Sequence, residues 1–260
     1  MCAYPPSQHS AAVSFADVTS SNIVGYNQLN TIANDMTIYG AQWQTPAGGN
    51  INIQYIKLPV DQCSDEGTEL LYVYTPGTGY EIYYYYTESV EDISIPEEDW
   101  VFKGPAWCTV EGQYVGDVLL PAGSAFWLST AAACNFTVAG AVPVANDGVR
   151  TLETKADAMS LYSIPFPIAG TVNNVKLLEG CTDEGTELLY VYTPGTGYEI
   201  YYYYTESVED ISLPEEDWVF KGPAWCTMEG QYVNIPLALG QGFWLSTAQD
   251  LTFTVESPVK

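Results

Sequence analysis

Residues 68–87 read TELLYVYTPGTGYEIYYYYT, and this stretch predicts the fold class. Its two halves are rich in Tyr, Val, Ile and Thr, the residues that fit a pleated sheet. Between them stands Pro76-Gly77-Thr78-Gly79, in which proline presets one backbone dihedral and glycine admits positive φ. Residues 68–75 and 80–87 are therefore predicted to pair as an antiparallel β-hairpin.

Four consecutive tyrosines, Tyr83 to Tyr86, lie in the second strand of this hairpin. Because alternate side chains of a strand point to opposite faces, one pair faces the core and the other pair faces away. Exposed aromatic area is typical of a contact surface for another subunit or for a sugar ring. The alternative is a sheet covered on both faces within its own domain. The predicted aromatic face, counted in both copies of the hairpin, consists of Tyr72, Tyr74, Tyr84, Tyr86, Tyr190, Tyr192, Tyr202 and Tyr204.

The hairpin belongs to a block that occurs twice. Residues 63–115 recur as residues 181–233, and a Phe-Trp-Leu-Ser-Thr segment follows each copy. Such a repeat predicts two structural units of the same kind. Several short strands with Gly and Pro turns predict that each unit is a β-sandwich or jelly-roll-like domain. The 53 positions differ at three pairs only: Ser64/Thr182, Ile95/Leu213 and Val110/Met228.

The chain divides into four predicted segments. They are an N-terminal arm or signal-peptide remnant at 1–16, a first β-domain at 17–140, a linker at 141–157 and a second β-domain at 158–260. Glycine, proline and asparagine residues mark the linker. Residues 11–16 resemble the end of a secretory signal, although no basic segment or full apolar core precedes them.

Two further elements are predicted in the first domain. Residues 118–120 and 126–129 flank a Pro-Ala-Gly turn and predict a second hairpin. Residues 136–138 predict a last strand, whereas residues 88–100 are interrupted by Pro96 and predict a loop. No stretch has convincing helical periodicity over three turns. The fold class is therefore predicted as all-β.

The cysteines predict the compartment. Cys63 and Cys108 are 45 residues apart, and so are Cys181 and Cys226. A pair that is duplicated with its unit predicts one disulfide in each domain, and disulfides indicate an oxidising, extracellular compartment. Buried free thiols are one alternative. A metal site is the other, although the chain lacks the short Cys-x-x-Cys pairs and histidines that zinc prefers.

Cys2 and Cys134 have no duplicated partner. They are predicted to form a disulfide with each other, or between neighbouring subunits, which would tie the N-terminal arm to a first domain. The alternative is that they are two unrelated free thiols.

The charge excludes several partners. The chain has 32 acidic and 7 basic side chains, a net charge of −25. Each repeated block holds eleven acids and one base, so the two blocks contribute −20 of this total. Phosphate backbones and anionic membrane surfaces are repelled by such a molecule. No apolar run approaches the ~20 residues that cross a bilayer, so neither nucleic acid nor a membrane span is predicted.

Acidic residues also cluster beside the hairpin. Carboxylates crowded near a turn are the kind of ligand that calcium takes, although their spacing is not that of an EF-hand loop. The alternative is a solvated acidic surface that keeps the protein soluble. No other cofactor is predicted. The candidate calcium ligands are Asp65, Glu66, Glu69, Asp183, Glu184 and Glu187.

Two short segments resemble a known group of proteins. Ser20-Ser21-Asn22-Ile23-Val24-Gly25-Tyr26 is similar to the start of poorly characterised secreted β-repeat proteins of the Planctomycetes–Verrucomicrobia group. These proteins often carry a Gly-x-Gly-Phe-Trp-Leu segment near the C-terminus, which here is residues 240–245; residues 123–128 depart from it at one glycine. The resemblance covers about a tenth of the chain. It implies secretion and β-structure, and it supplies no activity and no site residues.

The composition leaves little room for catalysis. The one histidine, His9, lies in a polar N-terminal stretch, so histidine-based triads and multi-histidine zinc sites are disfavoured. Carboxylate chemistry such as glycoside hydrolysis stays formally open, but no acid–base pair stands out. We therefore predict a non-catalytic, extracellular or cell-surface protein.

Two functions fit this description. The first is a structural subunit that polymerises with itself into an extracellular filament or surface assembly, because two equivalent modules form a pseudo-repeating rod. The alternative is a module that binds a polysaccharide or another surface ligand, with tyrosines and tryptophans as stacking platforms and two copies for avidity. The near-identity of the blocks favours a shared contact, and recent duplication with gene conversion explains it equally well.

Overall fold

The computed structural model describes residues 24–63, 67–91, 102–143, 149–177, 181, 186–206, 208–209 and 220–256. The chain is all-β and its strands pair antiparallel, which confirms the predicted class. The described helices are three-residue 3-10 turns, and none of them is long and apolar enough to cross a membrane. They are η1 (Ile53–Tyr55), η2 (Val60–Gln62) and η5 (Val172–Asn174).

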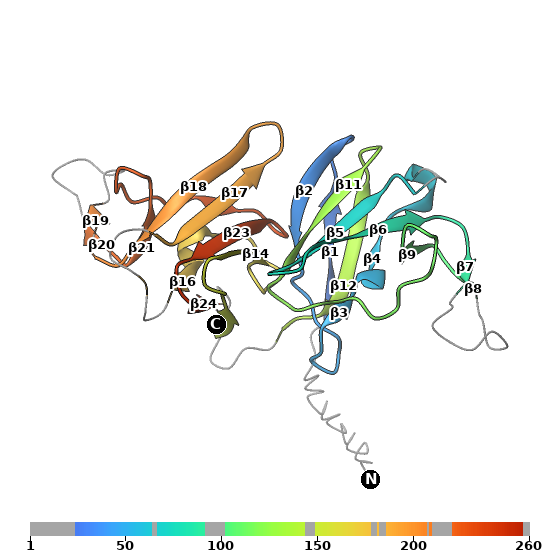
Figure 1. The fold of residues 1–260 in the computed structure, drawn as a ribbon, viewed down its shortest axis with the longest axis horizontal. Helices are drawn as coiled ribbons and strands as arrows, with labels where there is room; N and C mark the ends of the chain where they lie inside the picture. The colour runs from blue at the N-terminus through green and yellow to red at the C-terminus, as the bar shows by residue number, and fades with distance from the viewer. Residues whose placement is uncertain are drawn as a thin grey trace, which may run out of the picture.

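The first twelve strands of the described residues lie between residues 24 and 143, which we call the first repeat (Figure 1). Their sheet orders are β1-β12-β4, β2-β11-β5-β6-β9, β10-β3 and β7-β8. The strands are β1 (Val24–Asn30), β2 (Asp35–Gly40), β3 (Ile51–Asn52), β4 (Ile56–Lys57), β5 (Leu70–Thr75), β6 (Gly79–Tyr86), β7 (Val90–Glu91), β8 (Phe102–Lys103), β9 (Ala106–Cys108), β10 (Leu119–Leu120), β11 (Ala125–Thr130) and β12 (Asn135–Ala141).

The other twelve lie in residues 149–256, the second repeat, and each corresponds to the strand twelve labels before it. Their sheet orders are β13-β24-β16, β14-β23-β17-β18-β21, β15-β22 and β19-β20. The strands are β13 (Val149–Glu153), β14 (Ala158–Ser163), β15 (Gly170–Thr171), β16 (Val175–Leu177), β17 (Leu188–Thr193), β18 (Gly197–Tyr204), β19 (Val208–Glu209), β20 (Phe220–Lys221), β21 (Ala224–Cys226), β22 (Pro236–Leu237), β23 (Gly242–Thr247) and β24 (Thr252–Glu256).

The predicted hairpin is confirmed as β5 and β6, and its copy as β17 and β18. Gly77 and Gly79 in the turn have φ of +82° and +98°, which glycine adopts without a Cβ penalty. The Thr78 amide donates to the Thr75 carbonyl at 3.1 Å and closes the turn. The turn residues, together with the strand-forming residues on either side of them, therefore determine this hairpin locally.

A hydrophobic cluster fills the space between the three-stranded and five-stranded sheets of each repeat. In the first repeat it joins Phe136 of β12 to Phe126 of β11 and Trp107 of β9, all fully buried. In the second repeat Phe253, Phe243 and Trp225 occupy the corresponding places. The Trp107 indole donates to the Ile56 carbonyl at 2.8 Å, and the Trp225 indole to the Val175 carbonyl at 2.8 Å.

Two sequence predictions for the strands are wrong. β10 and β11 do not form a hairpin with each other: β10 pairs with β3, while β11 pairs with β2 and β5. The predicted linker 141–157 contains β13, which pairs with β24 along its whole length. In both cases the true partner is remote in sequence, so a turn signal between neighbouring segments is misleading. Residues 136–138 do form a strand, as part of β12.

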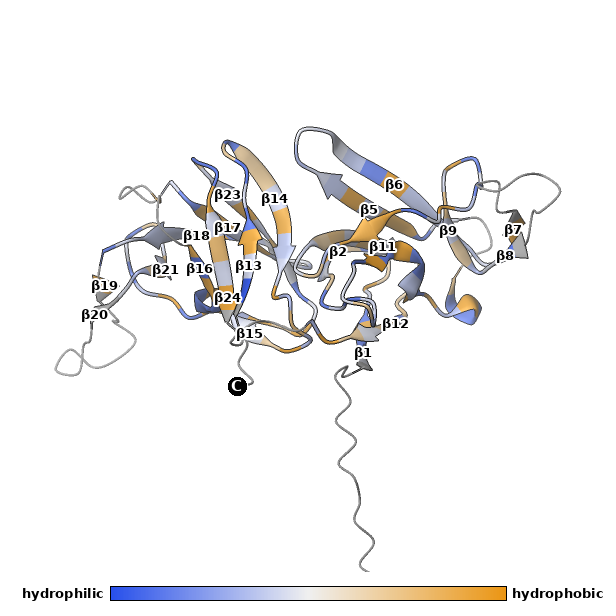
Figure 2. Cartoon of the chain, turned by 90° about the horizontal axis from the view of Figure 1, so that it is seen from below, coloured by the Kyte–Doolittle hydropathy of each residue, from blue (hydrophilic) through white to orange (hydrophobic). Residues whose placement is uncertain are grey.

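The two repeats lie side by side, and their five-stranded sheets approach each other (Figure 1). Seen from below, β14 of the second repeat lies beside the β5–β6 hairpin of the first (Figure 2). The contact surface between the repeats is called the junction below.

Candidate binding site at the junction of the repeats

The tyrosines of β6 alternate as predicted. Tyr83 and Tyr85 are buried in the core of the first repeat, whereas Tyr84 and Tyr86 are half-buried on the opposite face of the sheet. The Tyr85 hydroxyl donates to the Leu58 carbonyl at 3.1 Å. In β18 the same pattern places Tyr201 and Tyr203 inside and Tyr202 and Tyr204 outside.

Half of the predicted aromatic face, Tyr72, Tyr74, Tyr190 and Tyr192, packs where the two repeats meet. Tyr72 and Tyr74 of β5 share their face of the sheet with Trp127 of β11, and this face packs on its counterpart in the other repeat. The tyrosines at the far end of the face, such as Tyr84 and Tyr204, do not belong to this cluster. The junction cluster consists of buried Ile38, Ala125, Trp127, Leu161 and Trp244, with Met36, Tyr72, Tyr74, Tyr190 and Tyr192 packed against them.

The aromatic contacts at the junction are reciprocal. The ring centroids of Tyr74 and Trp244 are 4.9 Å apart at 75°, and those of Tyr192 and Trp127 are 5.1 Å apart at 65°. Edge-to-face pairs of this geometry are favourable because the positive ring edge meets the negative ring face. Each repeat thus contributes one tyrosine and one tryptophan in equivalent places, as in a two-fold interface.

Backbone hydrogen bonds repeat the same symmetry. The Gly40 amide donates to the Gly240 carbonyl at 2.8 Å, and the Ser163 amide donates to the Gly123 carbonyl at 2.8 Å. Side-chain bonds depart from this symmetry: the Tyr192 hydroxyl donates to a carboxylate oxygen of Asp35 at 3.3 Å, the Gln42 amide to the Ile164 carbonyl at 3.0 Å, and the Ser163 hydroxyl to the Ser124 carbonyl at 3.0 Å. These bonds fix the register of the two sheets at the junction.

An aromatic cleft opens where the two faces meet. Its volume is about 390 Å³. Tyr80 and Tyr198 stand at its rim with 48% and 49% of their surface exposed, while Trp127 below them retains 6%. The indole nitrogen of Trp127 is itself buried and lies beside the Tyr80 hydroxyl. The cleft is lined by Met36, Tyr72, Tyr80, Ile82, Trp127, Tyr192 and Tyr198.

The hydroxyls of this cleft are neutral at physiological pH. Burial raises the pKa of Tyr72, Tyr80 and Tyr198 above its ordinary value. The pKa of Tyr192 is raised by burial and then by the neighbouring Asp35 carboxylate. The cleft therefore offers flat rings and uncharged hydroxyls.

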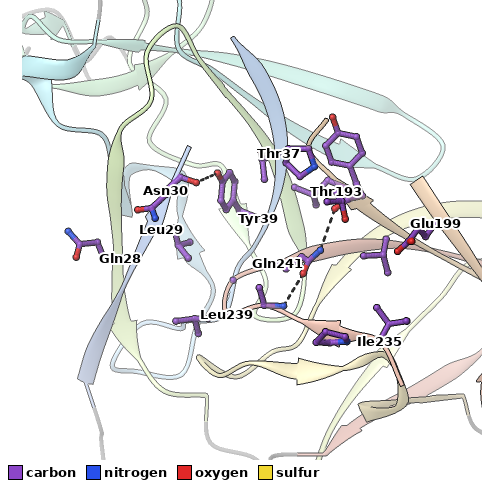
Figure 3. A pocket seen from close by; sticks show the side chains of 17 residues that line it. Gln28, Leu29, Asn30, Thr37, Tyr39, Thr193, Glu199, Ile235, Leu239 and Gln241 are labelled. Atoms are coloured by element: carbon purple, nitrogen blue, oxygen red, sulfur yellow. Dashed lines mark hydrogen bonds between the residues drawn. The ribbon is translucent and has the colours of Figure 1, made fainter. Parts of the chain in front are cut away.

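A side pocket of about 580 Å³ lies next to the cleft, between β1–β2 and the second repeat (Figure 3). Tyr192 lines both the pocket and the cleft. The polar wall of the side pocket includes Gln28, Thr37 and Glu199. The Gln241 side chain, which also lines it, accepts a hydrogen bond from the Ala238 amide and donates one to the Tyr192 carbonyl. The equivalent pocket on the other side of the junction, which includes Tyr74 and Tyr162, measures about 340 Å³.

Several of these residues were absent from the sequence prediction. Trp127 and Trp244 belong to the Phe-Trp-Leu-Ser-Thr segments, and strand alternation places them on the face opposite to buried Phe126 and Phe243. That alternation was available as a signal. Nothing in the local sequence shows that Gly40 and Gly242 contact the opposite repeat, because this contact depends on residues that are distant in the sequence.

The predicted disulfides do not form. Among the described residues, none of these four cysteines, Cys63, Cys108, Cys181 and Cys226, takes part in a disulfide. Cys108 follows Trp107 in β9, and Trp107 points into the core against which Cys63 packs, so Cys108 faces the opposite side of the sheet. Equal spacing in two copies reflects the duplication of the block, and it carries no information about which face each thiol occupies.

Cys134 is also a free, buried thiol, beside the Thr31 hydroxyl at 3.4 Å. Its predicted partner Cys2 and the predicted arm or signal remnant at 1–16 lie outside the described residues. The pairing of Cys134 with Cys2 therefore stays a prediction.

We expect the thiols to be unreactive in the native protein and fully reactive after unfolding. Burial raises the pKa of Cys63 to about 12 and those of Cys108, Cys181 and Cys226 to about 11, so little thiolate exists near pH 8. Alkylation followed by mass spectrometry, with and without denaturant and without reductant, measures this. A pair that resists alkylation in denaturant would show that a disulfide forms after all.

The candidate calcium ligands are not brought together in the described part of the chain. Glu69 and Glu187 are buried, and each accepts a hydrogen bond at 3.2 Å from the preceding threonine, Thr68 or Thr186. Asp65, Glu66, Asp183 and Glu184 lie outside the described residues. Among described residues no cluster of three potential ligands is found, so calcium stays a prediction.

The junction can stack on flat ligands and exchange hydrogen bonds with neutral polar groups. Its charged members near the cavities are the carboxylates of Asp35 and Glu199. No nucleophile–base pair is evident among the described lining residues. No family model, curated protein or solved structure matches the chain.

Proposed function

We propose that this protein is an extracellular, non-catalytic sugar-binding protein, built from two β-sandwich units that arose by duplication. The observation that supports binding is the aromatic cleft at the junction, in which Tyr80 and Tyr198 form a half-exposed rim above Trp127. The two-layer packing of each repeat and the repeated strand order support the duplication.

The chemistry of the cleft favours a neutral glycan. Aromatic rings pack against the C–H faces of sugar rings, and the phenol groups keep a polar end for hydroxyls. The net charge of −25 opposes anionic polysaccharides.

We expect the double variant Tyr80→Ala/Tyr198→Ala to bind a neutral polysaccharide about 5- to 150-fold more weakly. Two lost stacking contacts at roughly 0.5–1.5 kcal/mol each correspond to about that factor. Isothermal titration calorimetry against a panel of neutral glycans measures the affinity. Tyr55→Ala is the matched control, because Tyr55 is 46% exposed and does not line the cleft. Equal binding by the double variant, or no ligand in the panel, would contradict the proposal.

A second candidate is a structural subunit of an extracellular filament or surface assembly. The observation that favours it is the reciprocity of the junction: the same aromatic contacts that join two repeats of one chain can join repeats of two chains. The acidity of the subunit would then make assembly sensitive to salt and to calcium.

For this candidate we expect elongated assemblies in electron micrographs of the secreted protein, more abundant as salt or calcium screens the charge. Monodisperse monomers over the whole range of salt and calcium would exclude assembly. That result would leave the sugar-binding proposal untouched.

A further inference from the structure

Two glycines lie at the junction, Gly40 in the first repeat and Gly242 in the second, and they occupy different positions of the repeat. Gly40 of β2 pairs with Ala125 of β11, and the corresponding pair in the second repeat is Ser163 of β14 with Gly242 of β23. Each repeat therefore presents one glycine and one residue with a side chain, in exchanged order. Neither glycine has a positive φ, so backbone conformation does not require glycine at either place.

Space requires the glycines. A Cβ added at Gly40 would lie 2.3 Å from the Ser163 Cβ and 2.5 Å from its Oγ. A Cβ added at Gly242 would lie 2.8 Å from the Ala125 Cβ and 2.4 Å from the Ile38 Cγ2. Close-packed interiors do not absorb such overlaps without displacement of the sheets. Gly40 thus accommodates Ser163, and Gly242 accommodates Ala125 and Ile38.

The same distances exclude pairing between identical repeats. Two second repeats, packed by the same two-fold arrangement, would bring Ser163 against Ser163. Two first repeats would bring Ala125 against Ala125 and against Ile38. The aromatic contacts do not distinguish pairing of identical repeats from pairing of different repeats, since the Tyr74–Trp244 and Tyr192–Trp127 pairs have nearly the same geometry.

We infer that the junction is a heterotypic interface, and that the partner it fits outside its own chain is the opposite repeat of a second copy. The first repeat of one molecule accepts only the second repeat of another. Exchange of this contact between molecules therefore links them head to tail, a contact that extends into a chain unless it closes into a ring. The inference deepens the assembly candidate and is independent of sugar binding.

The pairing rule is tested first within one chain. Gly40→Ser places serine against serine and is expected to open the junction, which increases the radius of gyration in small-angle X-ray scattering and exposes the junction tryptophans to quenchers. Gly40→Ser/Ser163→Gly moves the serine to the other side and is expected to recover the closed monomer. A single variant as compact as the wild type, or a double variant that stays open, would overturn the rule.

Complementation tests the pairing between chains. Gly40→Ser blocks the first repeat but leaves the second intact, and Gly242→Ala blocks the second but leaves the first intact. Each variant alone is expected to stay monomeric at 28.5 kDa. Their mixture is expected to form a one-to-one heterodimer with twice that mass in size exclusion with light scattering. Circular dichroism confirms that each variant has its native strand content, and the recovered double variant shows that substitution at Gly40 is compatible with folding.

The outcomes separate the inference from the assembly candidate. A mixture of folded variants without heterodimer, or a homodimer of either variant, would refute heterotypic pairing. A heterodimer from the variants together with only monomers in electron micrographs of the wild type would support the pairing rule and refute the filament.

Discussion

Replacing Trp107 by alanine is expected to lower the free energy of unfolding by about 3–5 kcal/mol. The ring is fully buried, and its centroid lies 4.9 Å from that of Tyr85. The substitution also leaves the Ile56 carbonyl without the indole donor at 2.8 Å. The cavity and the unsatisfied carbonyl therefore both contribute to the loss.

Urea unfolding followed by circular dichroism measures this loss. Trp225→Ala is expected to cost about the same, because its indole donates to the Val175 carbonyl at 2.8 Å and its ring is equally buried. Val110→Met is the matched control: the second repeat has Met228 at that place, both side chains are exposed, and a change within about 0.5 kcal/mol is expected. A loss below about 1.5 kcal/mol for Trp107→Ala would show that the core is not built around this ring.

A cooperative loss of stability between pH 10 and 12 is expected from the buried tyrosines. Burial raises the pKa of Tyr39, Tyr85 and Tyr203 to about 12, against about 10 in an unfolded chain. Below pH about 10 the hydroxyls are protonated in both states, so their contribution to stability is complete. As the pH rises toward 12, the unfolded state releases protons first and is stabilised relative to the folded state.

Parallel titrations of tyrosinate absorbance and circular dichroism measure this behaviour. We expect a late group of tyrosines to ionise together with the loss of β-structure. Tyr85→Phe removes one such group and is expected to make the transition less steep; Tyr55→Phe, at a side chain that is 46% exposed, is the control for the loss of one hydroxyl. Ionisation of all 21 tyrosines near pH 10 with the β-structure intact would contradict the expectation.

The features that sequence predicts well are those with local causes. The β5–β6 hairpin follows from Pro76 and two glycines between strand formers, and the inside and outside tyrosines follow from strand alternation. The repeated strand order follows from a repeated sequence. These predictions need no knowledge of which distant segments meet.

The predictions that failed depend on distant partners. β10 lies next to β11 in sequence but pairs with β3, and β13 lies in the expected linker but pairs with β24. Cys63 and Cys108 lie on opposite faces of a sheet, which their spacing does not reveal. Antiparallel pairing between remote strands is decided by hydrophobic burial across the whole unit, and turn residues constrain it only at hairpins.

The sequence by itself therefore determined an all-β chain with a duplicated, acidic, tyrosine-rich block and a face of aromatic side chains. Only the tertiary structure decided that one half of this face packs against its own copy and leaves a cleft between Tyr80 and Tyr198. The physical reason is that the two blocks are nearly identical, whereas the residues that select their pairing lie outside them. The need for glycine at residues 40 and 242 is seen only at the junction. There an added Cβ would overlap Ser163 in one case and Ala125 in the other.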